Sequence, residues 1–390
     1  MTCHTQHSEA ESAAQLIAER GLEGLGDAVS LLINEAMRLE RERHLGVAPF
    51  ERSPERRGYA NGYKPKTVKS RVGALDLAVP QVREGGFYPQ SLDKGLRSER
   101  ALKLALAEMY VTGVSTRKIA RVTQELCGFE VSSSEVSRCA AELDEELTAW
   151  RERPLGRYPY VVLDARYEKM RHGGSVVDCA VLLAMGVNPD GQRELLGVSV
   201  ALSEAEVHWR GFLSDLAARG LHGTKLFVSD NHAGLKAARA AVFPSVPWQR
   251  CQFHLQQNAS HYVPKKSLKA RVAADIRAIF NAPDAVEAQR LLERFVTAYE
   301  TTAPDLAAWA ETALPEGLTV FTLPEHQRKR MRTSNAVERV NKEIKRRTRV
   351  ATLFPNEASC LRLVTAVVME ISEDWQTGRR YLNMNEDGAE

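Results

Sequence analysis

The sequence predicts a multidomain α/β protein, and three observations support that class. The chain has 390 residues, more than one ordinary hydrophobic core accommodates, so two or three domains are expected. Apolar residues recur with a helical period over 9–45, 98–153 and 265–313. Between the last two stretches, short β-branched runs alternate with helical segments, which is typical of a sheet covered by helices.

The first 97 residues divide into a helical part and a β part. Residues 9–45 are expected to be helical, with interruptions at three glycines. This segment is either a partner helix or a small DNA-contacting unit, and the sequence favours neither. Residues 46–97 are rich in Gly, Pro and Arg and contain the alternation Leu75, Leu77, Val79, which predicts a small β unit with basic loops.

Three helices are expected in residues 98–153, namely Ser98–Val111, Ser115–Leu126 and Ser132–Trp150, each with a serine placed to cap its start. A short helix, a tight turn and a Ser-rich helix start are the outline of a helix-turn-helix, whose second helix presents its first turns to base edges. The reading face would consist of Ser133, Ser134, Ser137 and Arg138. The alternative is a plain three-helix bundle with solvent-exposed serines.

Residues 154–264 are expected to form the sheet. Strands are predicted at Tyr160–Ala165, Val176–Val187, Glu194–Leu202, Lys225–Asp230 and Val246–Cys251, with helices at Trp209–Arg219 and Ala233–Val242. The turn signal Asn188-Pro-Asp-Gly191 makes the first three strands an antiparallel meander.

A helical block at 265–313, a basic helix at Asn335–Arg349 and an apolar helix at Glu357–Ile371 are expected to follow. The predicted division is a helical segment at 1–45, a β unit at 46–97, a helix-turn-helix region at 98–153, the α/β core at 154–264 and 326–390, and a helical insertion at 265–325.

The net charge of +3 conceals two strongly basic stretches. Ten Lys and Arg residues in Arg328–Arg349 oppose only Glu338 and Glu343, and ten in Arg38–Arg71 oppose four glutamates. Two such stretches on an otherwise mildly acidic chain favour a polyanionic partner, although many charge runs are only solvated surfaces.

Composition also bears on where the protein acts. Six cysteines without a C-x-x-C pair predict a reducing compartment, and we expect a cytoplasmic, nucleoid-associated protein. No secretory signal is visible in Met1–Gln15, and the most apolar stretch, Val176–Val187, is too short to span a bilayer, so no membrane partner is expected.

Two predicted strands end on aspartate, at Asp164 and Asp230. Carboxylates side by side at one sheet edge can hold Mg²⁺, which leaves its other positions to water or substrate phosphates. Glu338 is the candidate third acid because it lies inside the basic stretch. Taken singly, an aspartate at a strand end is more often a turn or cap residue, and Glu338 could cap a helix with Asn335 or pair with Lys342.

Three further residues stand out. Cys251 and His254 have the spacing of half a zinc site, without a second pair nearby, so packing or hydrogen bonding near the acidic residues is the alternative. Trp209 opens a predicted helix, where an aromatic side chain is more often in the core than stacked on a base.

Several motifs, taken in order, resemble one known family. These are Val162-Leu-Asp-Ala-Arg-Tyr-Glu-Lys169, Val228-Ser-Asp-Asn-His-Ala-Gly-Leu235, Cys251-Gln-Phe-His254, the run Thr333–Thr348, Asn61–Lys66 and Gly86-Phe-Tyr-Pro89. Together they resemble the Mutator-type transposases of bacterial insertion sequences, the IS256 family, over about residues 55–373.

The resemblance implies a ribonuclease-H-like core with a helical insertion, and an Asp-Asp-Glu triad at Asp164, Asp230 and Glu338. It implies two Mg²⁺ or Mn²⁺ ions, cleavage and transfer of DNA strands without a covalent protein intermediate, and signature positions at Cys251, His254 and Trp209. Its partners would be double-stranded DNA, as terminal inverted repeats and target, and further copies of the chain, at least a dimer.

Expected DNA contacts fall in both basic stretches and on the helix-turn-helix. Beyond its four reading residues they are Arg56, Arg57, Lys64, Lys66, Lys69, Arg71, Arg339, Lys342, Lys345, Arg346 and Arg347. Two rival functions remain. A regulator that only binds DNA would leave the α/β half unexplained, and a structure-directed nuclease would cut DNA without joining it.

Overall fold

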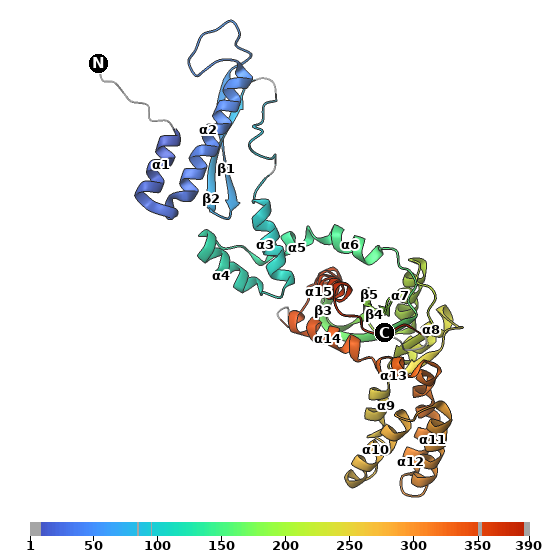
Figure 1. Ribbon diagram of the computed structural model, residues 1–390. Coiled ribbons are helices and arrows are strands. Elements are labelled where there is room, and N and C mark those ends of the chain that lie inside the picture. Colours follow the sequence, from blue (N-terminus) through green and yellow to red (C-terminus); the bar gives the residue numbers. More distant parts are fainter. Residues whose placement is uncertain (1–8, 84–85, 95, 350–352, 386–390) are drawn as a thin grey trace. The chain divides into compact units, whose positions relative to one another are not determined.

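The computed structural model describes residues 9–83, 86–94, 96–349 and 353–385, which form two compact units, Met1–Leu143 and Asp144–Glu390 (Figure 1). Every buried hydrophobic cluster lies wholly within one of the two. No helix in the described part of the chain is long and apolar enough to cross a membrane. The six segments predicted from the sequence divide the chain more finely than these two units, and that division remains a prediction.

The first unit begins with a helical layer packed on a hairpin. Its elements are α1 (Glu9–Arg20), the 3-10 turn η1 (Gly21–Gly24), α2 (Leu25–Leu45), β1 (Ala60–Ser70) and β2 (Gly73–Val82). Gly21 has a positive φ of 60°, which interrupts the helix where the sequence predicts. Met37 of α2 packs on Leu75, Leu77 and Val79, the inner face of the hairpin.

Three short helices complete this unit. They are α3 (Arg100–Val111), α4 (Thr116–Cys127) and α5 (Ser133–Ala141), packed around Leu106, Ile119 and Val136. As predicted, the hydroxyls of Ser115 and Ser132 cap α4 and α5 by accepting N–H groups of the first turn. The predicted cap of α3 at Ser98 is wrong, because Glu99 occupies the cap position and makes no side-chain capping bond.

The predicted third helix, Ser132–Trp150, is in fact two helices. The N–H groups of Glu142 and Leu143 bond three residues back, to Cys139 and Ala140, at 3.2 Å each, and the chain turns there. Helix α6 (Asp144–Glu152) then belongs to the second unit.

The second unit is built on one mixed sheet in the order β5-β4-β3-β6-β7. The strands are β3 (Tyr160–His172), β4 (Ser175–Val187), β5 (Arg193–Ala201), β6 (Leu226–Ser229) and β7 (Trp248–Arg250). The first three form the predicted antiparallel meander, and β6 and β7 join it in parallel.

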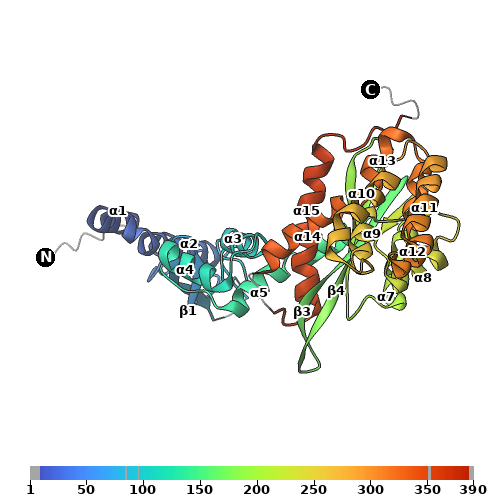
Figure 2. The ribbon, with the colours of Figure 1, turned by 90° about the horizontal axis from the view of Figure 1, so that it is seen from below.

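Helices cover both faces of this sheet, as the alternation of its side chains requires. Val161 and Leu163 of β3 pack under α7 (Glu206–Ala218) and α8 (Ala233–Val242). Tyr160 and Val162 face the opposite layer, which includes α14 (Asn335–Thr348) and α15 (Glu357–Thr377) (Figure 2).

A helical arm leaves the sheet after β7 and returns before α14 (Figure 1). It consists of α9 (Gln252–Ala259), η2 (Lys266–Leu268), α10 (Lys269–Phe280), α11 (Ala285–Tyr299), α12 (Pro304–Ala313), η3 (Leu314–Gly317), η4 (Thr319–Thr322) and α13 (Glu325–Met331). At its base the N–H of Gln252 donates to the carbonyl of Arg332 at 2.9 Å, so both ends of the arm meet.

Candidate active site

Asp164 and Asp230 are brought level at the centre of the sheet. β3 and β6 pair in parallel with Val162 opposite Val228, so the aspartates, each two residues further on, fall beside one another. β3 does not end near Asp164, as the sequence suggested, but continues to His172 in the hairpin with β4. Its parallel partner β6 ends at Ser229, directly before Asp230, so on that side no strand among the described residues continues beside β3 past the two aspartates.

Hydrogen bonds fix both carboxylates. Each accepts the N–H of its following residue, from Ala165 at 2.9 Å and from Asn231 at 2.7 Å. Asp164 also accepts the side-chain amide of Asn341 at 2.7 Å, and that residue lies on α14. Helix and strand therefore meet directly at the first aspartate.

Glu338 reaches this place from the same helix. Val337, Val340 and Ile344 anchor α14 in the core, which leaves Glu338 and Asn341, three residues apart, on one side of it. One oxygen of each, Oε1 of the glutamate and Oδ1 of the amide, is buried without a hydrogen-bond partner among the described residues.

The two ordinary roles considered for Glu338 are not what the structure records. Asn335 is the first helical residue rather than a cap, and Ser334, at the cap position, makes no side-chain capping bond. The described residues include no ion pair between Glu338 and Lys342. The neighbouring pair of Glu343 with Arg347 is confirmed, at 2.9 Å.

Negative charge accumulates at Asp164. Burial raises the pKa of its carboxyl to about 7, against the opposing effects of the Ala165 N–H and of His254, and the charges of Glu338 and Asp230 raise it further. As they stand, no three His, Cys, Asp or Glu side chains in the described parts of the chain group closely enough to hold a metal ion. The site therefore combines crowded carboxylates with unsatisfied oxygens.

Cys251 and His254 lie beside the acidic residues. The buried thiol of Cys251 accepts from the N–H and hydroxyl of Ser334, at 3.4 Å each, which ties the start of α9 to the start of α14. A hydrogen bond with Cys251 raises the pKa of His254 to about 9, and the charges of Asp230 and Asp164 act in the same direction. The His254 ring nitrogen Nδ1 lies 3.7 Å from Asp230.

Trp209 lies elsewhere. Its ring is fully buried on the α7 side of the sheet, against Phe212, and its indole N–H has no partner in the part of the chain that the structure describes. The core role is thus the one observed, and its burial leaves no exposed ring face for a base to stack on.

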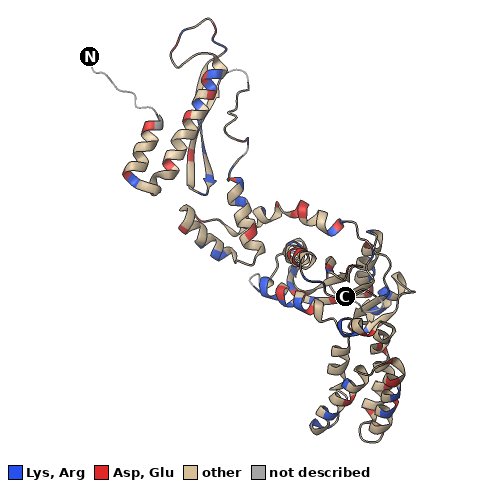
Figure 3. Cartoon of the chain, in the orientation of Figure 1, with Lys and Arg blue, Asp and Glu red and all other residues tan. Residues whose placement is uncertain are grey.

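Most of the predicted contacts on α14 face solvent, and Lys and Arg gather along this helix (Figure 3). Arg339, Lys342, Lys345 and Arg346 are exposed. Arg347 differs from them, because its side chain is only 7% exposed and donates two hydrogen bonds to Glu370 and one to Glu343. The structure thus assigns Arg347 to holding α14 on α15 rather than to a free surface.

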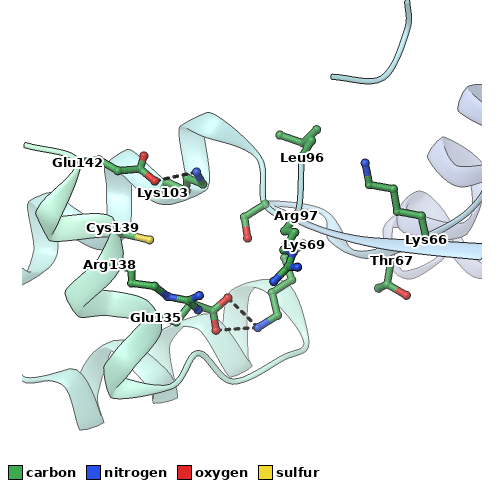
Figure 4. A pocket seen from close by; sticks show the side chains of 11 residues that line it. Lys66, Thr67, Lys69, Leu96, Arg97, Lys103, Glu135, Arg138, Cys139 and Glu142 are labelled. Carbon is green, nitrogen blue, oxygen red and sulfur yellow. Dashed lines mark hydrogen bonds and ion pairs between the residues drawn. The ribbon is translucent and has the colours of Figure 1, made fainter. Parts of the chain in front are cut away.

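In the first unit, predicted contacts meet at a hollow of about 740 Å³ (Figure 4). Lys66 and Lys69 of β1 line it together with Arg138 of α5, and Lys69 is paired with both oxygens of Glu135, at 2.9 and 3.0 Å. Ser133, Ser134 and Ser137 lie exposed on α5. Outside the hollow, the guanidinium of Arg56 lies over the ring of Tyr59, Arg71 pairs with Glu99, and Arg57 and Lys64 are exposed.

Sequence reasoning missed Asn341 and Arg166. Arg166 donates to the Asn341 carbonyl at 2.5 Å, which holds β3 against α14, and it pairs with Glu168 of its own strand at 2.6 Å. The spacing of Asn341 three residues after Glu338 was the available signal, since it places both on one side of a helix.

Fold and site together define a class: a mixed α/β protein whose central sheet carries carboxylates at one end, beside a strongly basic helix. Comparison with known proteins makes this specific. The chain belongs to the Mutator family of transposases, whose family description, "Transposase, Mutator family", matches residues 1–378.

Curated relatives agree over nearly the whole chain. The chain is 56% identical over 387 residues to the transposase for insertion sequence element IS406 of Burkholderia multivorans, covering 99% of this chain and 100% of the relative. It is 34% identical to the transposase for IS256 in transposon Tn4001 of Staphylococcus aureus, covering 92% of each. A solved simian T-cell lymphotropic virus intasome in complex with PP2A regulatory subunit B56 gamma matches at 11% identity over 53% of this chain and 65% of its own, with a TM-score of 0.18.

Proposed function

We propose that this transposase cleaves and transfers DNA strands with Asp164, Asp230 and Glu338 as an Asp-Asp-Glu triad. The observation that carries the proposal is the parallel register of β3 and β6, which sets two aspartates level, with a glutamate of α14 beside them. The sheet order β5-β4-β3-β6-β7, three antiparallel strands followed by two parallel ones, supports a ribonuclease-H-like core.

The donor atoms fit a hard divalent cation, Mg²⁺ or Mn²⁺. Carboxylate and amide oxygens are the ligands such ions take, and Glu338 and Asn341 each present a buried oxygen without a partner. When bound, two ions would activate the attacking oxygen and stabilise the leaving one. Water and substrate phosphates would complete the coordination of each ion.

The chain's own groups then have distinct tasks. Asn341 holds the Asp164 carboxylate in one orientation through its amide hydrogen bond. His254, charged beside Asp230, offsets part of the negative charge. The exposed cations of α14, Lys342 and Lys345 among them, bind backbone phosphates near the carboxylates.

Recognition of the element ends belongs to the first unit in this proposal. The two short capped helices α4 and α5 support a helix-turn-helix in which α5 presents its exposed serines and Arg138 to base edges. The cationic hollow beside α5 binds the phosphate backbone (Figure 4). Because two DNA ends must be joined, the active form is at least a dimer.

An assay with labelled element ends and MgCl₂ tests the proposal against its rivals. Joined products are expected from the wild-type chain, and none from Asp164→Asn, which should still bind the ends. Cleavage without joining would favour a nuclease. DNA binding without either reaction in the wild type would favour a regulator that only binds DNA, and would contradict the triad.

A further inference from the structure

A second hollow, of about 470 Å³, lies in the second unit where the helical arm meets the sheet. Its walls come from the loop after β6, the end of β7, α9 with its following loop, and α12. Two aromatic rings form one side. Tyr262 and Trp309 stack with ring centroids 5.3 Å apart and planes 20° apart, and Tyr262 is 41% exposed.

Polar groups without partners face the same space. The side chains of Asn231, Asn258 and His261 line the hollow and make no hydrogen bond within the described residues. They offer both donors and acceptors around a flat apolar surface. A ligand that stacks and also forms hydrogen bonds in its plane would satisfy them.

The two charged side chains that line the hollow pair with each other. Arg250 donates to Glu316 at 3.1 Å, and Lys236, which does not line the hollow, donates to the other oxygen of the same carboxylate. By contrast, the cationic hollow of the first unit suits a phosphate group. The expected ligand here is therefore an uncharged, planar, polar group.

The hollow adjoins the carboxylates. Asn231 directly follows Asp230, and Asn258 lies four residues after His254, on the same side of α9. A group bound here would therefore lie close to a phosphodiester held at Asp230.

We propose that this hollow binds one unpaired nucleobase of the DNA strand next to the phosphodiester that is cut. The base leaves the duplex and stacks on the Tyr262 and Trp309 pair, and the two asparagines and His261 contact its edge. Extruding a base costs a few kcal/mol, which stacking on aromatic side chains offsets. The inference rests on the proposed function for the position of the cut strand.

The test compares wild type and Trp309→Ala on duplexes of the element's end in MgCl₂. On a fully paired duplex we expect the variant to cleave more slowly by roughly 5- to 150-fold, the range for losing one stacked base. When the nucleotide beside the cut is abasic, no base remains to be stacked, and the ratio of rates should approach one. A ratio near one on the paired duplex, or an equal ratio on both, would overturn the proposal.

A readout without catalysis separates this inference from the proposed function. Asp164→Asn protein is irradiated on duplexes carrying 5-iodouracil at successive positions around the cut. Crosslinks to Tyr262 or Trp309 are expected from one position only. Crosslinks from no position would overturn the base site. If the wild type does not cleave although these crosslinks form, the proposed triad chemistry is contradicted and the base site is not.

Two controls address folding. Trp309→Phe keeps an aromatic face and should retain most of the paired-duplex rate, whereas a loss equal to that of Trp309→Ala would contradict stacking. Val286→Ala, at an 80% exposed position of α11 on the same arm, should match wild type on both duplexes. If Trp309→Ala does not fold, Asn258→Ala, a substitution on α9, is compared with the wild type on the same two duplexes.

Discussion

The carboxylate of Asp164 is costly to ionise in this fold. Its pKa is raised to about 7 by burial and by Glu338 and Asp230, against about 3.9 in an unfolded chain. The folded state therefore favours the protonated form, and the stability this contributes is complete below about pH 4 and lost as pH rises towards 7. At pH 8 and without metal, Asp164→Asn should raise Tm by about 2–4 °C for each kcal/mol of this ionisation cost that it removes.

Thermal unfolding at pH 8 and pH 5 checks this expectation. The difference between variant and wild type should shrink at pH 5, where Asp164 is largely protonated. Added MgCl₂ should raise the Tm of the wild type at pH 8 more than that of Asp164→Asn. A variant less stable than wild type at both pH values would show that the carboxylate is not under strain.

His254 should stay charged at neutral pH because of Cys251. The hydrogen bond with Cys251 is the main cause of its raised pKa of about 9, so the stability it contributes is complete below about pH 6.5 and is lost as pH rises through 9. Cys251→Ala should lower this pKa towards 6.5, which a ¹⁵N NMR titration of the imidazole measures. The control is Cys139→Ala, a buried thiol of the first unit. An unchanged His254 titration in Cys251→Ala would refute the link.

At the level of elements, two cations of α14 should behave in opposite ways. Arg347 is buried and bonded to Glu370 and Glu343, so Arg347→Ala should lower the free energy of unfolding by about 1–3 kcal/mol. Arg347→Lys should not rescue it, because an ammonium cannot form the two parallel hydrogen bonds. Denaturant unfolding measures both.

Lys345 is the matched exposed position on the same helix. Lys345→Ala should leave stability within about 0.5 kcal/mol of wild type. It should weaken DNA binding uniformly across sequences and reduce the salt slope by about one. Loss of stability in Lys345→Ala, or of DNA affinity alone in Arg347→Ala, would reverse the assignment.

Local patterns predicted some elements well. Helix α8 (Ala233–Val242) has the predicted bounds, and Asn188–Gly191 forms the predicted turn, because each carries its own signal of period or turn chemistry. The break after Ala141 carried no Gly or Pro and was missed. The continuation of β3 to His172 was missed because its outer half is stabilised by pairing with β4, not by an apolar run.

The candidate site could be anticipated only in part. The two aspartates followed from strands that precede them, but Asn341 as their partner required the packing of α14 on β3, which no local pattern encodes. In the same way, the burial of Arg347 depends on Glu370, which belongs to another helix. The sequence alone therefore could not distinguish Arg347 from the exposed cations beside it.

At the level of the whole molecule, the two units have separate hydrophobic cores. A chain ending at Leu143 is therefore expected to fold and to bind the element's ends in a salt-dependent manner, without cleaving them. Fluorescence anisotropy at several salt concentrations measures this, with Arg138→Ala as the comparison. An unfolded fragment would contradict its independent folding. A folded fragment that does not bind would place DNA recognition in the second unit or in both together.

The closed base of the helical arm has a further consequence, for how such proteins diverge. The contacts of Cys251 with Ser334 and of Gln252 with Arg332 bring the arm's entry and exit together, so the arm is a helical insertion that leaves and rejoins the core at one place. Since loop closure becomes only slowly costlier with length, the arm can be lengthened, shortened or exchanged between relatives while Glu338 keeps its place. The junction is thus a natural graft point for building chimaeras between relatives.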